Sequence, residues 1–228
     1  MEIENNLMSQ LIFKFPFKTQ YFKQDFYVSS NNFSAYKLIE SWPNWSSKWV
    51  NVYGVSGSGK THLSKILEKK IKKILIVESK NISSDTIDNL KDIDCLIIDN
   101  FVNDIDEKIF YSLLNESKQL EKFILINSKK PIRDFTQKLS DLKSRLDSFL
   151  FIGIDLPTDD LLQVIITKSF SDKQVNLDPK ITSFIIKNVD RSYDKMSKFL
   201  REIDEFSLSS GKSININLIK KCLKFKNE

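Results

Sequence analysis

The sequence predicts an α/β fold, in which a five-stranded parallel sheet is flanked by helices and followed by a small all-α domain. Five short apolar runs alternate with amphipathic segments between residues 48 and 155, as strands buried on both faces of a parallel sheet do. A glycine-rich loop joins the first run to an amphipathic segment. Beyond Pro157 the amphipathic segments follow one another with no strand between them, which indicates a separate helical layer.

The elements follow in order. A first helix over 31–42 places Ala35, Leu38 and Ile39 on one face, and Pro43 ends it. The expected strands cover 48–54, 73–79, 94–100, 122–128 and 149–155. The helices between them cover 61–71, 84–92, 106–120 and 134–146. The helices of the final domain cover 158–170, 178–189, 193–206 and 217–225.

These elements divide the chain into three parts. Residues 1–25 form a tail with many aromatic side chains and no regular pattern. Residues 26–156 form the α/β domain, and residues 157–228 form a helical domain within the usual size range of domains.

Charge is a weak guide to partners here. The net charge is +5, but only four of the 35 basic residues are arginines. Direct readout of bases relies on arginine as well as lysine, and no arginine cluster is present. The positive balance alone therefore does not indicate nucleic-acid binding.

The compartment follows from the cysteines and the N-terminus. Cys95 and Cys222 lack metal-ligand spacing, and the polar N-terminus does not resemble a secretory signal. No apolar run approaches the length of a membrane span. We expect a cytoplasmic protein in a reducing compartment, with no membrane partner.

Residues 54–61, GVSGSGKT, match the pattern G-x-x-x-x-G-K-[ST]. Glycines let the backbone wrap closely around phosphates, and the following helix N-terminus adds partial positive charge. The lysine would reach the outer phosphates and the threonine hydroxyl would bind Mg²⁺. A plain glycine turn is the alternative, but the flanking strand and helix favour binding of ADP or ATP. The candidate residues are Gly54, Gly57, Ser58, Gly59, Lys60 and Thr61.

A second element of the site ends the run CLIIDN. Asp99 at the end of this strand is expected to hold Mg²⁺ together with Thr61. Asn100 stands where many ATPases carry a glutamate that activates water, and an amide cannot act as a general base. We therefore expect a site that binds nucleotide well and hydrolyses it weakly or not at all by itself. An ordinary strand-end aspartate is the alternative interpretation.

His62 follows Thr61 and is included among the candidate nucleotide-binding residues. It is the only histidine, so it has no histidine partner for a metal, and packing is the simpler role.

Arg145 lies in LKSRLDSF, near the end of the helix before the fifth strand. A guanidinium at a subunit edge can reach the terminal phosphate of a neighbour's nucleotide and accelerate hydrolysis. The alternative is a surface arginine paired with Asp141 or Asp147, which contributes little. Position in the sequence does not decide between the two.

The tail carries a second candidate for partner binding. The stretch QLIFKF has Gln10, Leu11, Phe13 and Phe15 spaced as an extended peptide that docks into a pocket of a partner. Taken alone, packing of these aromatics on the protein's own core is the more common outcome.

The loop, the strand ending in aspartate, the helix bearing arginine and the final helices together resemble the AAA+ ATPases, and among them the DnaA clade. DFYVSSNNFSAYKLI, GKTHL and LKSRL are similar to that clade, although Ser29 replaces a glycine. The resemblance implies an AAA+ P-loop NTPase domain followed by a helical lid.

Within the clade, the chain is similar to the Hda family of short DnaA-homologous regulators, because the sequence stops after the lid and QLIFKF resembles their sliding-clamp motif. The resemblance implies that the nucleotide-bound protein, held on the DNA-loaded polymerase III clamp, stimulates hydrolysis of ATP bound to DnaA through Arg145. DNA would be contacted mainly through the clamp, and self-association is possible.

Besides Ser29, two positions depart from the family pattern, and the tail lacks a perfect clamp motif. Lys129 occupies the place of an acidic sensor, and Asp194 stands where a lid arginine contacts phosphates, with Arg191 as the expected substitute. Both changes alter charge near the nucleotide. A helicase-loader-type ATPase and a DnaA-like accessory factor are the alternative functions.

Overall fold

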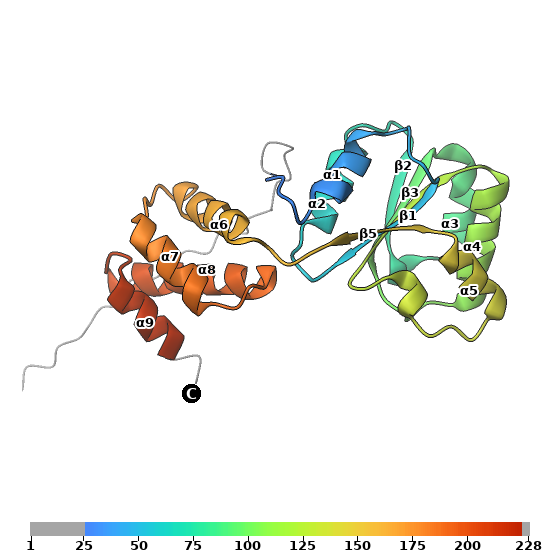
Figure 1. Ribbon diagram of the computed structural model, residues 1–228. Coiled ribbons are helices and arrows are strands. Elements are labelled where there is room, and N and C mark those ends of the chain that lie inside the picture. The colour runs from blue at the N-terminus through green and yellow to red at the C-terminus, as the bar shows by residue number, and fades with distance from the viewer. Residues whose placement is uncertain (1–25, 225–228) are drawn as a thin grey trace, which may run out of the picture. The chain divides into compact units, whose positions relative to one another are not determined.

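The computed structural model describes residues 26–224, which separate into two compact units at the junction of Leu156 and Pro157. The first unit contains the sheet and the helices that flank it, and the second contains only helices (Figure 1). Each unit has its own apolar core.

The sheet has five parallel strands in the order β2-β3-β4-β1-β5. Their bounds lie within a residue or two of the expected ones: β1 Trp49–Gly54, β2 Ile74–Glu78, β3 Cys95–Phe101, β4 Phe123–Ser128 and β5 Leu150–Ile154. The three inner strands are buried almost throughout, which explains their continuous apolar runs. The predicted parallel α/β sheet is therefore confirmed.

Helices cover both faces of this sheet (Figure 1). One face carries α1 (Phe33–Glu40) and α2 (Lys60–Glu68), whose buried residues pack with Val50, Val52 and Ile97. The other face carries α4 (Glu107–Gln119) and α5 (Ser140–Asp147), which pack with Ile98 and Ile126. The short α3 (Ser84–Asp88) continues into a 3₁₀ turn, Asn89–Asp92, so the helix expected over 84–92 is present as two pieces.

The helix expected over 134–146 is wrong in its first half, because α5 begins only at Ser140. The segment before Ser140 is kept out of the helix by contacts with residues that are distant in the sequence. Phe135 packs edge-on against Phe101, with ring centroids 5.5 Å apart. The Glu107 carboxylate accepts hydrogen bonds from the backbone N–H groups of Lys138 and Leu139. These bonds satisfy donors that a longer helix would have used.

Asn51, in the middle of β1, is fully buried and ties the sheet to the loop after β4. Its Nδ2 donates to the Ile126 carbonyl and to Ser128 Oγ, both at 2.9 Å. Its Oδ1 accepts from the Ile132 N–H at 3.0 Å. A buried amide with all three bonds made fixes the loop that carries Lys129.

We predict that Asn51→Ala lowers the free energy of unfolding by about 3 kcal/mol, because it removes three buried hydrogen bonds. Urea unfolding followed by circular dichroism measures the change. Asn103→Ala, which removes one exposed bond to the Thr136 carbonyl, is the control and should change stability by less than about 1 kcal/mol. Equal effects of the two substitutions would contradict this account.

The second unit is a helical domain of α6 (Asp159–Ser171), α7 (Pro179–Asn188), α8 (Tyr193–Ser210) and α9 (Ile216–Lys224). Thr158 and Asp178 cap α6 and α7 by accepting backbone N–H bonds, as N-cap residues do. Leu162, Phe170 and Phe199 are among its buried core residues. Among residues 26–224, no helix combines the length and apolar content needed to cross a bilayer.

Candidate functional site

The glycine-rich loop lies between the carboxyl end of β1 and the first turn of α2. Gly57 and Gly59 have φ angles of +76° and +96°, which side chains larger than hydrogen rarely adopt. A Cβ at Gly59 would also lie 2.9 Å from the Phe26 ring. The loop can therefore curl tightly over the helix N-terminus, where backbone N–H groups bind anions.

The Lys60 ammonium is held at the centre of this loop. Its Nζ donates to the Gly54 carbonyl at 2.7 Å, the Val55 carbonyl at 2.8 Å and Ser58 Oγ at 3.2 Å. These neutral acceptors keep the cation in place, and none of them neutralises its charge. An anionic phosphate is a stronger acceptor than a carbonyl, so the arrangement suits exchange of these bonds for phosphate oxygens.

Thr61 and Asp99 lie close together, as the sequence predicts for an Mg²⁺ site. Thr61 Oγ1 donates to Asp99 Oδ2 at 2.8 Å, while Asp99 Oδ1 accepts from Asn127 Nδ2 at 2.9 Å and from the Asn100 N–H at 3.0 Å. Within the described chain, no three His, Cys, Asp or Glu side chains gather as a metal site. Hydroxyl and carboxylate oxygens fit Mg²⁺ if phosphates supply further ligands.

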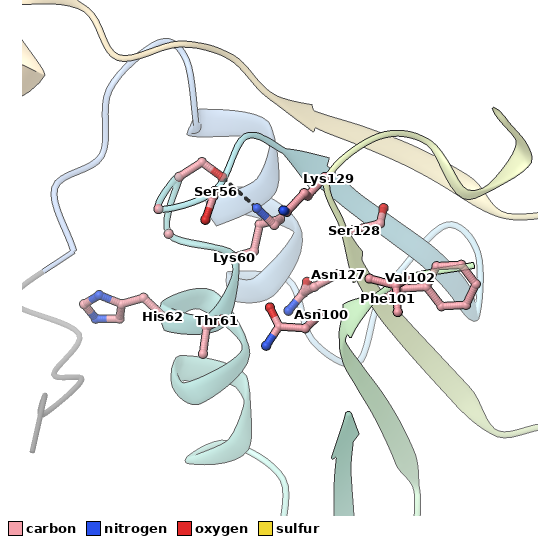
Figure 2. A pocket seen from close by; sticks show the side chains of 13 residues that line it. Ser56, Lys60, Thr61, His62, Asn100, Phe101, Val102, Asn127, Ser128 and Lys129 are labelled. Atoms are coloured by element: carbon pink, nitrogen blue, oxygen red, sulfur yellow. Dashed lines mark hydrogen bonds between the residues drawn. The ribbon is translucent and has the colours of Figure 1, made fainter. Parts of the chain in front are cut away.

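A cavity of about 590 Å³ opens in front of these groups (Figure 2). Three segments line it: the loop with the start of α2, the end of β3, and the end of β4 with Lys129. The lining residues are Ser56, Gly57, Ser58, Gly59, Lys60, Thr61, His62, Asn100, Phe101, Val102, Asn127, Ser128 and Lys129. Two lysines and no Asp or Glu are among them, so the cavity favours an anionic ligand.

Asn100 points into the cavity (Figure 2) and has a φ angle of +52°. Asparagine tolerates this left-handed conformation better than most residues. None of the described cavity-lining residues carries a carboxylate. The one lining side chain that can accept a proton is the imidazole of His62, which packs against Phe26, so no acidic group is placed to activate an attacking water.

We predict that Asn100→Glu raises the intrinsic rate of ATP hydrolysis at least about tenfold, because it supplies the missing general base. The positive φ adds a stability cost of about 1 kcal/mol. Phosphate release by the isolated protein measures the rate. Asn100→Gln, which has the same length without the base, is the control and should stay at the wild-type rate. A rate unchanged by glutamate would show that something else limits hydrolysis.

His62 lies on the first turn of α2 at the rim of this cavity (Figure 2). Its ring packs edge-on against Phe26, with centroids 5.3 Å apart, and Phe26 stacks on Tyr36 at 5.8 Å. His62 therefore has the packing role that the sequence favours, and it also lines the edge of the cavity.

Two site residues were not singled out from the sequence: Asn127 and Ser128, at the carboxyl end of β4. Asn127 is 1% exposed and also donates to Ser64 Oγ at 2.7 Å. Among the described residues its Oδ1 has no hydrogen-bond partner. The signal was the pair Asn-Ser ending an otherwise apolar strand, since carboxyl ends of parallel strands form the ligand edge of such sheets.

Arg145 is placed by α5 just before β5 begins, at the amino-terminal edge of the sheet. The loop of residues 54–59 follows the carboxyl end of β1, which runs parallel to β5 in the register Val50 with Leu150. Five residues of strand separate the two edges by about 16 Å. Arg145 thus lies at the opposite edge of the sheet from the glycine-loop cavity.

Arg145 is hydrogen-bonded to a neutral side chain, and not to either of the acids, Asp141 and Asp147, that a surface ion pair would use. Its Nε donates to Asn115 Oδ1 on α4 at 3.0 Å. In the part of the chain that the structure describes, it forms no ion pair with Asp141 or Asp147. The guanidinium is half-buried and keeps its full charge, because the side chain that fixes it is neutral.

The remaining predicted residues are not brought into this site. Arg191 belongs to the helical unit, where it forms an ion pair with Asp159 at 2.9 Å, so its contact with nucleotide stays a prediction. The tail residues Gln10, Leu11, Phe13 and Phe15 lie outside the described residues.

No family model matches the chain. Among curated proteins it is similar to the chromosomal replication initiator protein DnaA of Buchnera aphidicola subsp. Baizongia pistaciae, with 30% identity over an alignment of 253 residues. The alignment covers 96% of this chain and 54% of the relative. The chain therefore spans about half the length of that relative.

Two solved structures illustrate the similarity of fold. Domain III of the Thermotoga maritima replication initiation protein DnaA has a TM-score of 0.73 and 19% identity, and the match covers 92% of this chain and 98% of that one. AMPPCP-bound DnaA from Aquifex aeolicus has a TM-score of 0.66 and 19% identity, with 79% and 64% covered. The chain thus has the AAA+ P-loop NTPase fold that the sequence predicts, and this fold is DnaA-like.

Proposed function

We propose that this DnaA-like AAA+ chain is a cytoplasmic regulator of replication initiation that holds its own adenine nucleotide and stimulates hydrolysis of ATP bound to DnaA. The observation that carries the proposal is the division of groups between two edges of one sheet. The carboxyl edge has a glycine loop and a cavity lined by no carboxylate, whereas the amino edge has a charged arginine fixed by a neutral side chain.

The nucleotide would serve as a fixed part of the structure. Backbone N–H groups of the loop and the Lys60 ammonium would bind the phosphates, and Thr61 Oγ1 with Asp99 Oδ2 would hold Mg²⁺. The bound Mg²⁺ would neutralise phosphate charge. Asn100 cannot activate water, so the ligand, ADP or ATP, would remain bound while the protein acts on its partner. Binding of AMPPCP by the DnaA of A. aeolicus supports an adenine nucleotide as the ligand.

The partner's hydrolysis is where Arg145 would act. Since the guanidinium is about one strand length from its own cavity, it can reach terminal phosphates only on another subunit. There it would stabilise negative charge that develops on the transferred phosphoryl group. The 30% identity to the DnaA of B. aphidicola supports DnaA as the partner, because a DnaA-like chain would suit a DnaA-like interface.

A DnaA-like accessory factor is the second candidate. The observation that favours it is that the similar sequence is that of the initiator DnaA itself. Such a factor would join an initiator assembly through the same interface and leave the ATP of its neighbour intact.

Turnover of ATP preloaded on DnaA distinguishes these functions. We expect the chain with ADP to accelerate turnover, and a DNA-loaded clamp to increase the effect further. Binding to DnaA without acceleration would instead identify the accessory factor. DNA-stimulated hydrolysis by the chain alone would identify a helicase-loader-type ATPase and contradict the proposal.

The clamp contact is proposed for the tail, with Gln10, Leu11, Phe13 and Phe15 docking as an extended peptide. We predict that Gln10→Ala weakens capture of the sliding clamp about tenfold or more, because the glutamine amide would lose its hydrogen bonds in the clamp pocket. Surface plasmon resonance with immobilised clamp measures it. Gln20→Ala, in the same tail outside the motif, is the control. Undiminished capture would remove the tail from the partner-binding residues.

A further inference from the structure

A second recess opens at the amino-terminal edge of the sheet, where the ends of α4 and α5 meet the start of β1. It has a volume of about 400 Å³. We call it the amino-edge recess. The residues that line it are Ser47, Lys48, Trp49, Ser117, Lys118, Glu121, Lys122, Arg145 and Ser148. None of these side chains lines the cavity at the glycine loop. Only Arg145 has a role in the proposed function.

The recess is positively charged. Four of its nine lining residues are cations and one, Glu121, is an acid. Glu121 is 80% exposed and pairs with Lys48 at 3.0 Å, so this pair is at the rim. Lys122 Nζ lies 3.5 Å from the Lys91 carbonyl, and Lys118 is exposed on the last turn of α4. The remaining charge favours an anionic ligand.

The arginine in this recess is fixed in orientation. Asn115 Oδ1 accepts the hydrogen bond from Nε at 3.0 Å, which leaves the two terminal amino groups of the fork available for a pair of oxygens. A carboxylate at position 115 would hold the fork equally well but would neutralise it. The amide positions the guanidinium and preserves its charge.

A buried hydroxyl adds an independent observation. Ser117 lies on α4, is fully buried and lines the recess. Among the described residues its Oγ has no hydrogen-bond partner. Buried polar groups are nearly always paired, so this unpaired hydroxyl marks the wall of the recess as a polar surface that suits an oxygen-rich ligand.

We propose that the amino-edge recess receives the terminal phosphates of a nucleoside triphosphate held by another P-loop subunit, with Asn115 as the positioning residue of Arg145 and Lys118 as a second cation. This inference rests on the proposed function. It extends the phosphate-binding group from Arg145 alone to a site that also includes Asn115 and Lys118. The competing explanation is that Lys118 and Lys122 only stabilise the negatively polarised ends of helices.

Substitutions at Asn115 test the positioning role. We expect Asn115→Ala to lower the maximal rate of stimulated DnaA hydrolysis about tenfold, while the concentration for half-maximal stimulation stays unchanged. Asn115→Asp should lower the maximal rate as well, because it neutralises the guanidinium. A merely structural hydrogen bond would be kept by aspartate, so full stimulation by Asn115→Asp would overturn the assignment.

Substitution of Lys118 tests the receptor. Lys118→Ala should raise the half-maximal concentration about threefold and weaken its dependence on salt. Lys108→Ala, at the exposed other end of α4, should change neither. A lower melting temperature with unchanged stimulation would mean that Lys118 only stabilises the helix. If Arg145→Ala also leaves stimulation intact, the proposed function fails; if only the Asn115 and Lys118 variants do, the recess alone is wrong.

Discussion

Arg145→Ala is expected to reduce stimulated hydrolysis of DnaA-bound ATP about a thousandfold or more, while binding of ADP to the chain itself stays unchanged. The rate follows from the role of the guanidinium, since an arginine supplied to a partner's phosphates contributes about 10³–10⁵ in rate. The unchanged binding follows from position, because Arg145 lies at the opposite edge of the sheet from the loop that would hold the nucleotide. Single-turnover phosphate release from preloaded DnaA measures the rate, and titration calorimetry measures the binding.

Two further variants sharpen this test. Arg145→Lys keeps the charge but loses the planar fork and the Nε–Asn115 bond, so it should restore little of the rate. Arg133→Ala removes an exposed arginine that packs on Phe151 at 4.5 Å and should stimulate as well as the wild type. Full stimulation by Arg145→Ala would remove this residue from the mechanism.

Lys60→Ala is expected to weaken binding of ADP at least about a hundredfold. The ammonium is the one side-chain cation in the glycine loop of residues 54–61, and no neutral residue replaces its charge-assisted bonds to phosphate. ADP at about 100 times its Kd stabilises a folded protein by about 2.7 kcal/mol. The wild type should therefore melt several degrees higher with ADP, and the variant should not.

The control for this substitution is on the same helix. Lys65 pairs with Glu68 at 2.9 Å on the exposed side of α2, so Lys65→Ala should keep the full ADP-induced rise in melting temperature. A similar rise in Lys60→Ala would mean that backbone N–H groups alone hold the phosphates.

The features that could be predicted from the sequence are those that produce a local pattern of residues. The strands appear as runs of apolar residues because both faces of the sheet are covered, and the glycine loop appears as a spacing because phosphates require close backbone approach. Asp99 could be placed near Thr61 because the ends of parallel strands share one edge of the sheet.

The parts that could not be predicted depend on contacts between distant residues. The residues before Ser140 have a helical pattern, but Phe101 and Glu107 hold them in another conformation. The hydrogen bond between Arg145 and Asn115 joins α5 to α4. From the sequence, the expected partners were two acids closer along the chain, Asp141 and Asp147. Tertiary contacts of this kind override local propensity.

The chain is proposed to keep its own nucleotide and to cause hydrolysis of the nucleotide bound to DnaA. The most direct measurement loads DnaA with γ-³²P-labelled ATP and the chain with γ-³³P-labelled ATP, then follows release of the two labelled phosphates after mixing on DNA with the clamp. We predict fast release of ³²P and almost no release of ³³P. Fast release of ³³P, or no acceleration of ³²P release, would contradict the claim.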